Sequence, residues 1–244
     1  MNRMNSTLLR ILVSAGWLSL AIAPAAGDDW PGWRGAHRDS LCKEAGLLHS
    51  WPPEGPRLLW KVKGLGEGLS GPAIVGDRLY TMGNSDGKEK VLALDLAHDG
   101  KLVWSSAIGD VRHLGGGYPG PRATPSIDGN RLYSLGINGD LVCMDTQDGR
   151  ILWSHDFVRE FGGKIHDQGY SESPLVDGPW VISTPGMKEA TLVAIDKMTG
   201  SLVWAAPVGD PAAHASVVKF TSGGVEQYVT ITGKGVISVR AKDG

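Results

Sequence analysis

The amino-acid sequence predicts an all-β fold made of repeated four-stranded antiparallel sheets. The first observation is a motif of aspartate, glycine and tryptophan that recurs at intervals of about 50 residues, and such self-similarity marks a repeat architecture. Its copies are Asp95, Gly100 and Trp104, then Asp145, Gly149 and Trp153, then Asp196, Gly200 and Trp204. The second is composition, because 35 glycines and 9 tryptophans in 244 residues are typical of short strands joined by tight turns. Together they predict a β-propeller in which each repeat forms one blade.

Each repeat contains four short β-type runs separated by turn residues, which is the pattern of an antiparallel meander. The expected strands are residues 71–75, 78–82, 91–94 and 101–104, then 125–127, 132–135, 141–144 and 151–153, then 174–176, 181–183, 192–195 and 202–204. The expected blades are therefore residues 70–104, 123–153 and 171–204.

A fourth repeat covers residues 215–244 and stops at the turn that would lead into its outermost strand. Residues 58–62, which precede the first blade, have the pattern of an outermost strand without a blade of its own. One interpretation is that this strand closes a four-bladed ring, because closure removes exposed sheet edges. The other is an open arc that forms part of a longer propeller. We favour the open arc because the sequence stops between two strands.

The first 25 residues have the features of a secretory signal peptide. Arg3 and Arg10 precede an apolar run at 11–23, and small residues follow at 23–25. The alternative, an N-terminal membrane anchor, is disfavoured because the run is shorter than the ~20 residues that span a bilayer. We expect a periplasmic or secreted protein that does not span the membrane after cleavage, with residues 26–57 as an N-terminal extension.

Charge and cysteine content narrow the possible functions. The formal net charge is -2 and no cluster of Lys and Arg stands out, which disfavours nucleic acid as a partner. The two cysteines, Cys42 and Cys143, lie in different sequence contexts, and we expect no disulfide.

Residues 194–204 resemble the tryptophan-docking motif A-x-D-x-x-T-G-x-x-x-W of the pyrroloquinoline-quinone-like (PQQ-like) propeller repeat. The resemblance covers residues 58–244, although Arg240 stands where the fourth copy would have its aspartate. It implies that each indole, Trp60 included, packs between neighbouring blades and stabilises the fold. The segments 29–35 and 170–178 also resemble stretches of exported bacterial PQQ-like proteins of unassigned activity.

The resemblance also implies that the first strand of each blade is innermost, so that the residues just ahead of it face the mouth of a central funnel. Two long linkers, 105–121 and 154–170, reach the same region, and long loops on a rigid scaffold often carry binding residues. The candidate ligand-binding or partner-binding residues are Arg122, Glu172, His166, Asp167 and Tyr118. The alternative is that Arg122 and Glu172 form a structural ion pair.

These observations favour an exported, non-catalytic binding scaffold that takes an envelope or extracellular protein or peptide through its funnel loops. We expect no cofactor and no metal, because the His155-Asp156 and His166-Asp167 pairs lack a third ligand at a recognisable spacing. One alternative is a PQQ-dependent quinoprotein dehydrogenase that oxidises an alcohol or sugar with PQQ and calcium. That group carries adjacent cysteines, which this sequence lacks. A second alternative is an outer-membrane protein assembly factor, although no lipid-attachment cysteine follows the apolar run.

Overall fold

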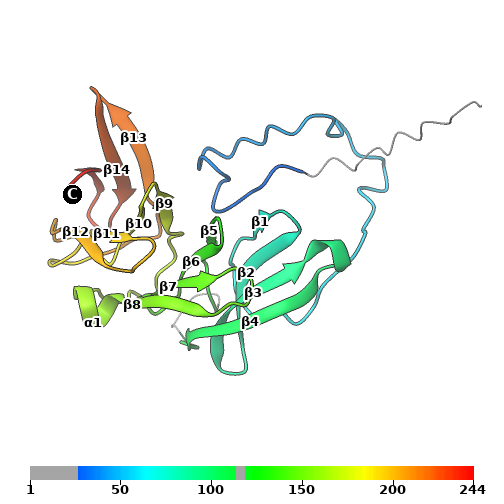
Figure 1. Cartoon of the computed structure of the whole chain (residues 1–244), viewed down its shortest axis with the longest axis horizontal. Helices are drawn as coiled ribbons and strands as arrows, with labels where there is room; N and C mark the ends of the chain where they lie inside the picture. The colour runs from blue at the N-terminus through cyan, green and yellow to red at the C-terminus, as the bar shows by residue number, and fades with distance from the viewer. Residues whose placement is uncertain (1–26, 114–118) are drawn as a thin grey trace, which may run out of the picture.

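The computed structural model describes residues 27–113 and 119–244, so the expected signal peptide at 1–25 and Tyr118 lie outside the described residues. The described chain forms four antiparallel sheets arranged as an open arc (Figure 1). Three sheets have four strands and the last has three. The predicted all-β propeller of four-stranded blades, present as a partial and open arc, is therefore confirmed.

The strands of each blade follow one another in chain order. Blade 1 contains β1 (Ala73–Val75), β2 (Arg78–Ser85), β3 (Lys88–Asp95) and β4 (Lys101–Asp110). Blade 2 contains β5 (Ser126–Asp128), β6 (Arg131–Leu135), β7 (Asp140–Asp145) and β8 (Ile151–Asp156). Blade 3 contains β9 (Leu175–Asp177), β10 (Trp180–Ser183), β11 (Leu192–Asp196) and β12 (Leu202–Ala206). Blade 4 contains β13 (Val218–Ser222), β14 (Val225–Ile231) and β15 (Val236–Arg240).

The tryptophans lie at matching seams between blades. A Cβ atom at Gly149 would lie 2.5 Å from the Trp104 ring, and one at Gly200 would lie 2.8 Å from the Trp153 ring. Both glycines also have positive φ, of 72° and 77°, a backbone conformation that other residues rarely adopt. The turn therefore favours glycine both by its conformation and by the lack of space for a side chain. The indole of Trp104 also donates to the Thr146 carbonyl of the next blade at 3.0 Å. Each tryptophan thus packs on the turn of the following blade.

The aspartate of each motif organises the turn beneath the tryptophan. The Asp145 side chain accepts from the Gln147 backbone N–H at 2.8 Å, and the Asp145 carbonyl accepts from the Gly149 N–H at 3.0 Å. In the fourth copy the Arg240 carbonyl accepts from the Gly244 N–H at 2.9 Å, so the turn survives without the carboxylate. The backbone geometry of the repeat is therefore preserved at its least similar copy.

Residues 58–62 form no strand in the structure, in contrast to the expected ring-closing strand. A Cβ atom at Gly100 would nevertheless lie 2.9 Å from the Trp60 ring, which is the relation that Trp104 has to Gly149. The segment thus occupies the position of an outer strand ahead of blade 1. The physical reason that it stays unpaired is distance, because β13–β15 lie at the other end of the arc (Figure 1).

The linker at 154–170 is more ordered than a loop. It contains the end of β8 and the short helix α1 (Phe157–Phe161), whose N-cap Asp156 accepts from the Val158 and Arg159 N–H groups at 2.9 and 3.0 Å. Phe157 and Phe161 are buried, so apolar packing anchors the helix. The first half of the linker is therefore held by capping and packing, whereas residues 162–170 form no helix or strand.

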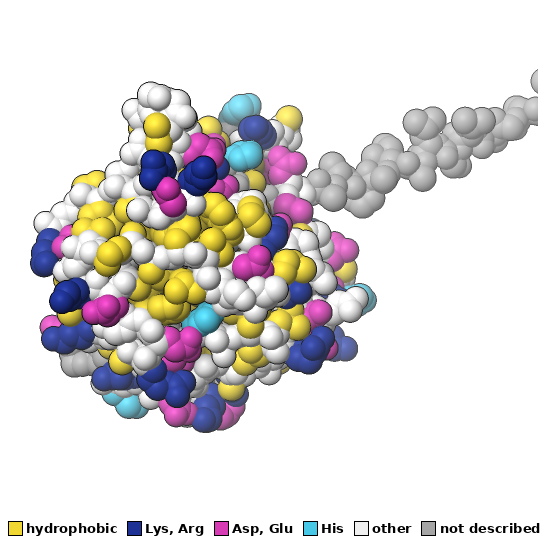
Figure 2. All heavy atoms as spheres, turned by 60° about the vertical axis from the view of Figure 1, so that its left-hand side comes forward, with side chains coloured by type: hydrophobic (Ala, Val, Ile, Leu, Met, Phe, Trp, Pro, Cys, Tyr) yellow, Lys and Arg dark blue, Asp and Glu magenta, His cyan; other side chains and the backbone are white. Residues whose placement is uncertain are grey.

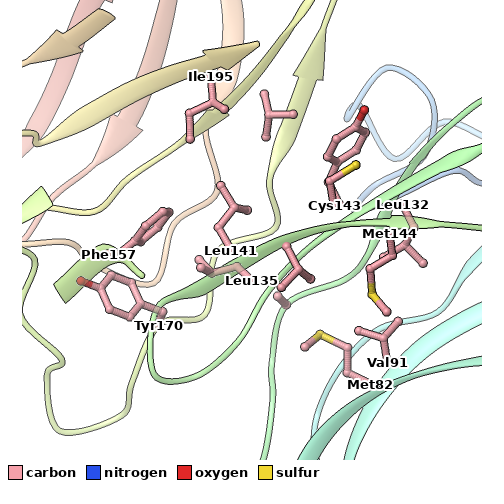
Figure 3. Packing of buried hydrophobic residues seen from close by; sticks show 14 of the residues in the cluster. Met82, Val91, Leu132, Leu135, Leu141, Cys143, Met144, Phe157, Tyr170 and Ile195 are labelled. Carbon is pink, nitrogen blue, oxygen red and sulfur yellow. The ribbon is translucent and has the colours of Figure 1, made fainter. Parts of the chain in front are cut away.

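The hydrophobic core runs between the blades. Residues from β2 and β3 meet residues from β6 and β7, and Phe157 and Tyr170 extend the same cluster toward blade 3 (Figure 3). A second cluster joins blades 3 and 4 around Ile182, Leu192 and Tyr228. Figure 2 shows hydrophobic side chains gathered on the side that carries the last blades, where Phe220, Ile231 and Val236 are exposed.

Both cysteines are free, Cys42 exposed and Cys143 buried, as the sequence predicts. In the parts of the chain that the structure describes, no helix is both long and apolar enough to cross a membrane.

Candidate functional site

Residues 29–38, here called the axial strap, lie against the innermost strands of the blades (Figure 1). Trp30 exchanges two backbone hydrogen bonds with Ile74 of β1, at 2.7 and 2.8 Å. The Pro31 carbonyl accepts from the Ile127 N–H of β5 at 2.7 Å. The first part of the N-terminal extension therefore pairs with the innermost strands of blades 1 and 2, a role that the sequence did not suggest.

Arg38 extends the strap to the other two blades. Its guanidinium donates to the carbonyls of Ser173 at 3.0 Å and Pro174 in blade 3, and to the Val217 carbonyl beside blade 4 at 2.8 Å. The same group lies 5.7 Å from the centre of the Trp33 ring, within the range of a cation–π contact. Burial lowers the pKa of Arg38 to about 10, and the charge of Glu172 opposes that shift.

Glu172 is a buried carboxyl that faces this interior. It is 2% exposed, and its Oε1 accepts from the Ser183 hydroxyl and the Thr184 N–H, while its Oε2 has no protein partner. Burial raises the pKa of Glu172, and those two donors and the charge of Arg38 act in the opposite direction. The ion pairs among the described residues do not join Arg122 to Glu172, and Arg38 is the cation that faces this carboxyl.

A second polar group lies where the chain enters the innermost strands. We call it the rim cluster, and its members are Arg122, His166, Ser171 and His214. The imidazole rings of His166 and His214 lie 4.7 Å apart, edge to face, and Ser171 Oγ lies 2.8 Å from His214 Nδ1. Arg122 donates to the Gln168 carbonyl, which ties the residues ahead of blade 2 to the linker ahead of blade 3.

The rim cluster is rich in hydrogen-bond donors and cations. Burial lowers the pKa of His166, and the charges of His214 and Arg122 lower it further, while Asp167 raises it. The Nε2 atom of His166 is buried and has no protein partner. Such a group suits an acceptor, a carboxylate above all, because Arg and His can both donate to carboxylate oxygens. No group of three or more metal-ligating residues occurs in the described ranges.

The structure thus separates the residues proposed from the sequence into two places. Arg122, His166 and Asp167 lie together at the rim, whereas Glu172 points inward to the axial strap. The tryptophan-docking residues lie at the seams.

Two functional candidates were missed by the sequence analysis. His214 precedes the innermost strand of blade 4 just as Arg122 precedes that of blade 2, so the same positional rule would have found it. Arg38 carried no such signal, because its partners are backbone carbonyls more than a hundred residues away.

His155 contacts neighbouring elements through both of its ring nitrogens. Its Nε2 atom contacts the Gly200 carbonyl at 2.7 Å, and its Nδ1 atom contacts Glu160. Both contacts support the seam between blades 2 and 3.

The open arc of blades and its indole seams define a protein of the PQQ-like β-propeller class. A family model described as outer membrane protein assembly factor BamB matches residues 87–244, and the chain belongs to that family. Two relatives named outer membrane protein assembly factor BamB are each 33% identical, one from Kangiella koreensis over 84 residues and one from Shewanella oneidensis over 82. The alignments cover 34% and 32% of this chain but only 18% and 20% of the relatives.

Solved structures show the same fold at low sequence identity. A quinohemoprotein alcohol dehydrogenase from Pseudomonas putida HK5 has a TM-score of 0.52 and 16% identity over 76% of this chain and 34% of that one. The computationally designed Ika4 protein has a TM-score of 0.50 and 15% identity over 78% of this chain and 99% of the design. At these identities the likeness concerns the fold alone.

Proposed function

We propose that this protein is an exported, non-catalytic binding scaffold that takes a protein or peptide of the cell envelope at the rim cluster, as an outer membrane protein assembly factor. Membership of the family supports the general role, since relatives carry that name. The observation that carries the proposal is the rim cluster, where Arg122 and His214 lie with His166 and Ser171 at one mouth of the arc.

The geometry favours a partner segment that bears carboxylates. The rim residues come from the linkers ahead of blades 2, 3 and 4, so one ligand can contact several blades at once. The contacts of Arg122 with Gln168 and of Ser171 with His214 hold these side chains in place before the partner arrives, which lowers the entropy cost of binding.

The proposal places the protein in the periplasm or outside the cell and assigns no cofactor to the site. PQQ and calcium belong to the dehydrogenase alternative. The likeness to an alcohol dehydrogenase is one of fold and does not favour that chemistry here.

The direct test is a binding titration with a purified outer-membrane β-barrel protein kept unfolded in dilute urea. We expect Arg122→Ala combined with His214→Ala to weaken binding by about tenfold or more, equivalent to about 1.4 kcal/mol. Lys101→Ala, which removes an exposed cation on the outer strand of blade 1, is the control and should bind like the parent.

Equal binding by the parent and the double variant would remove the rim cluster from the proposal. Dye reduction with an alcohol in the presence of PQQ and calcium would instead support the dehydrogenase alternative.

A further inference from the structure

The axial strap contacts the blades mainly as an extended peptide ligand would. Its first contacts are backbone hydrogen bonds to Ile74 and Ile127, which lie on the innermost strands of two blades. Asp29 adds a side-chain contact, accepting from the Gly76 N–H at 2.8 Å. Main-chain pairing along strand edges is how sheets recognise extended peptides, with side-chain pockets adding specificity.

Where the strap approaches blade 2, Gly32 leaves little room for a side chain. A Cβ atom at Gly32 would lie 3.3 Å from Ser126 Oγ and 3.5 Å from Ser126 Cα. A larger side chain would therefore push the strap away from β5. Because glycine has no side chain, the strap backbone at Gly32 can pack directly against the backbone of blade 2.

Arg38 anchors the far end of the strap. It satisfies carbonyls of two blades and provides the cation that faces the buried Glu172. Because a carboxylate that is 2% exposed is costly without a nearby cation, the strap and Glu172 stabilise each other. Arg34, by contrast, donates to Ser40, just beyond the strap, and stays exposed.

We propose that the inner edges of the four blades form one continuous peptide-binding track, and that residues 29–38 occupy it as an intramolecular ligand anchored by Arg38. The partner that this track fits is an extended segment with an aromatic residue and proline at one end and an arginine at the other. The strap of a second copy meets that description. This inference is independent of the rim cluster and of the proposed function.

Amide hydrogen exchange on the full chain tests whether the strap is a separable ligand. In Arg38→Ala we expect exchange at Ile74 and Ile127 to rise about tenfold or more, because their N–H groups donate to the strap. Amides within β3 and β7 should exchange as in the parent. Arg34→Ala is the matched control on the same segment and should leave Ile74 and Ile127 protected.

Binding in trans provides the second measurement. A fluorescein-labelled synthetic peptide of residues 28–39 should bind Arg38→Ala at least about tenfold more tightly than the parent, whose track is occupied. Gly32→Val keeps the Arg38 side chain and displaces the strap at another point, so it should also bind the peptide.

Three results would overturn the inference. The first is unchanged exchange at Ile74 and Ile127 in both Arg38→Ala and Gly32→Val. The second is equal peptide binding by the parent and these two variants. The third is loss of amide protection throughout the sheets in these two variants. The last result would make the strap a part of the core. Loss of rim binding in Arg122→Ala with His214→Ala, with the strap amides still protected, would keep the two sites distinct.

Discussion

Glu89 is a fully buried carboxyl at the seam between blades 1 and 2. Both of its oxygens lie 3.1 Å from the Ile137 N–H, and a Cβ atom at Gly136 would lie 2.9 Å from its Oε2. Burial raises the pKa of Glu89 to about 7, the Ile137 N–H opposes this shift, and the charge of Asp140 adds to it. The pKa of Asp140 is itself raised to about 6, chiefly by burial.

The raised pKa makes stability depend on pH in a defined direction. Between 4.5, the ordinary pKa of a glutamate, and about 7, the folded state holds a proton on Glu89 that the unfolded chain has released. The free energy of unfolding therefore falls as pH rises through this window, by about 3 kcal/mol when the full shift is converted at about 1.4 kcal/mol per pH unit. Glu89→Gln keeps an acceptor for Ile137 and removes the titration.

Urea unfolding followed by tryptophan fluorescence from pH 4.5 to 8 measures this effect. We expect the unfolding free energy of the parent to fall more steeply than that of Glu89→Gln, with the difference growing toward pH 7. Glu54→Gln, at an exposed carboxyl, should follow the parent. A constant difference between parent and Glu89→Gln at every pH would refute the reasoning.

The seam between blades 2 and 3 gives three further predictions, each checked by urea unfolding at pH 7. Trp153→Ala should lower the free energy of unfolding by about 3 kcal/mol, whereas Trp51→Ala, at an exposed tryptophan, should lower it by less than about 0.5 kcal/mol. Equal losses would contradict a structural role for the seam indole. Gly200→Ala should cost about 2 kcal/mol or more, because φ is 77° and the new Cβ meets Trp153 at 2.8 Å. Gly178→Ala, at φ 55° with open space, should cost about 1 kcal/mol, and an equal cost at both glycines would rule out the indole contact. Asp196→Ala should lower the free energy of unfolding by about 1 kcal/mol, because the carboxylate accepts from the backbone N–H groups of Met198 and Thr199. An unchanged free energy would show that the turn forms without this cap.

The repeat could be predicted because its information is local. Alternating apolar residues, turn glycines and the aspartate of each turn lie within a few residues of one another, and these set the strands and their order. The strand ends were less well predicted, since β4 continues to Asp110 and α1 begins at Phe157 within an expected loop. Those extensions depend on packing between elements.

The candidate site was predicted in part. The sequence put Arg122 just ahead of an innermost strand and His166 in the following linker, and in the structure the charge of Arg122 acts on His166. The same rule could not show that Glu172 turns inward, because the direction of its side chain depends on Ser183, Thr184 and Arg38.

By itself, the sequence determined the class of fold, the number of strands in each repeat and the residues that dock at each seam. Only the tertiary structure decided that residues 29–38 lie against the innermost strands, that Arg38 faces Glu172 and that residues 58–62 remain unpaired. The physical reason is the separation along the chain between the residues that interact. Strand periodicity and turn chemistry act between near neighbours in the chain, whereas the strap is held by carbonyls and a buried charge that folding brings to it from distant blades.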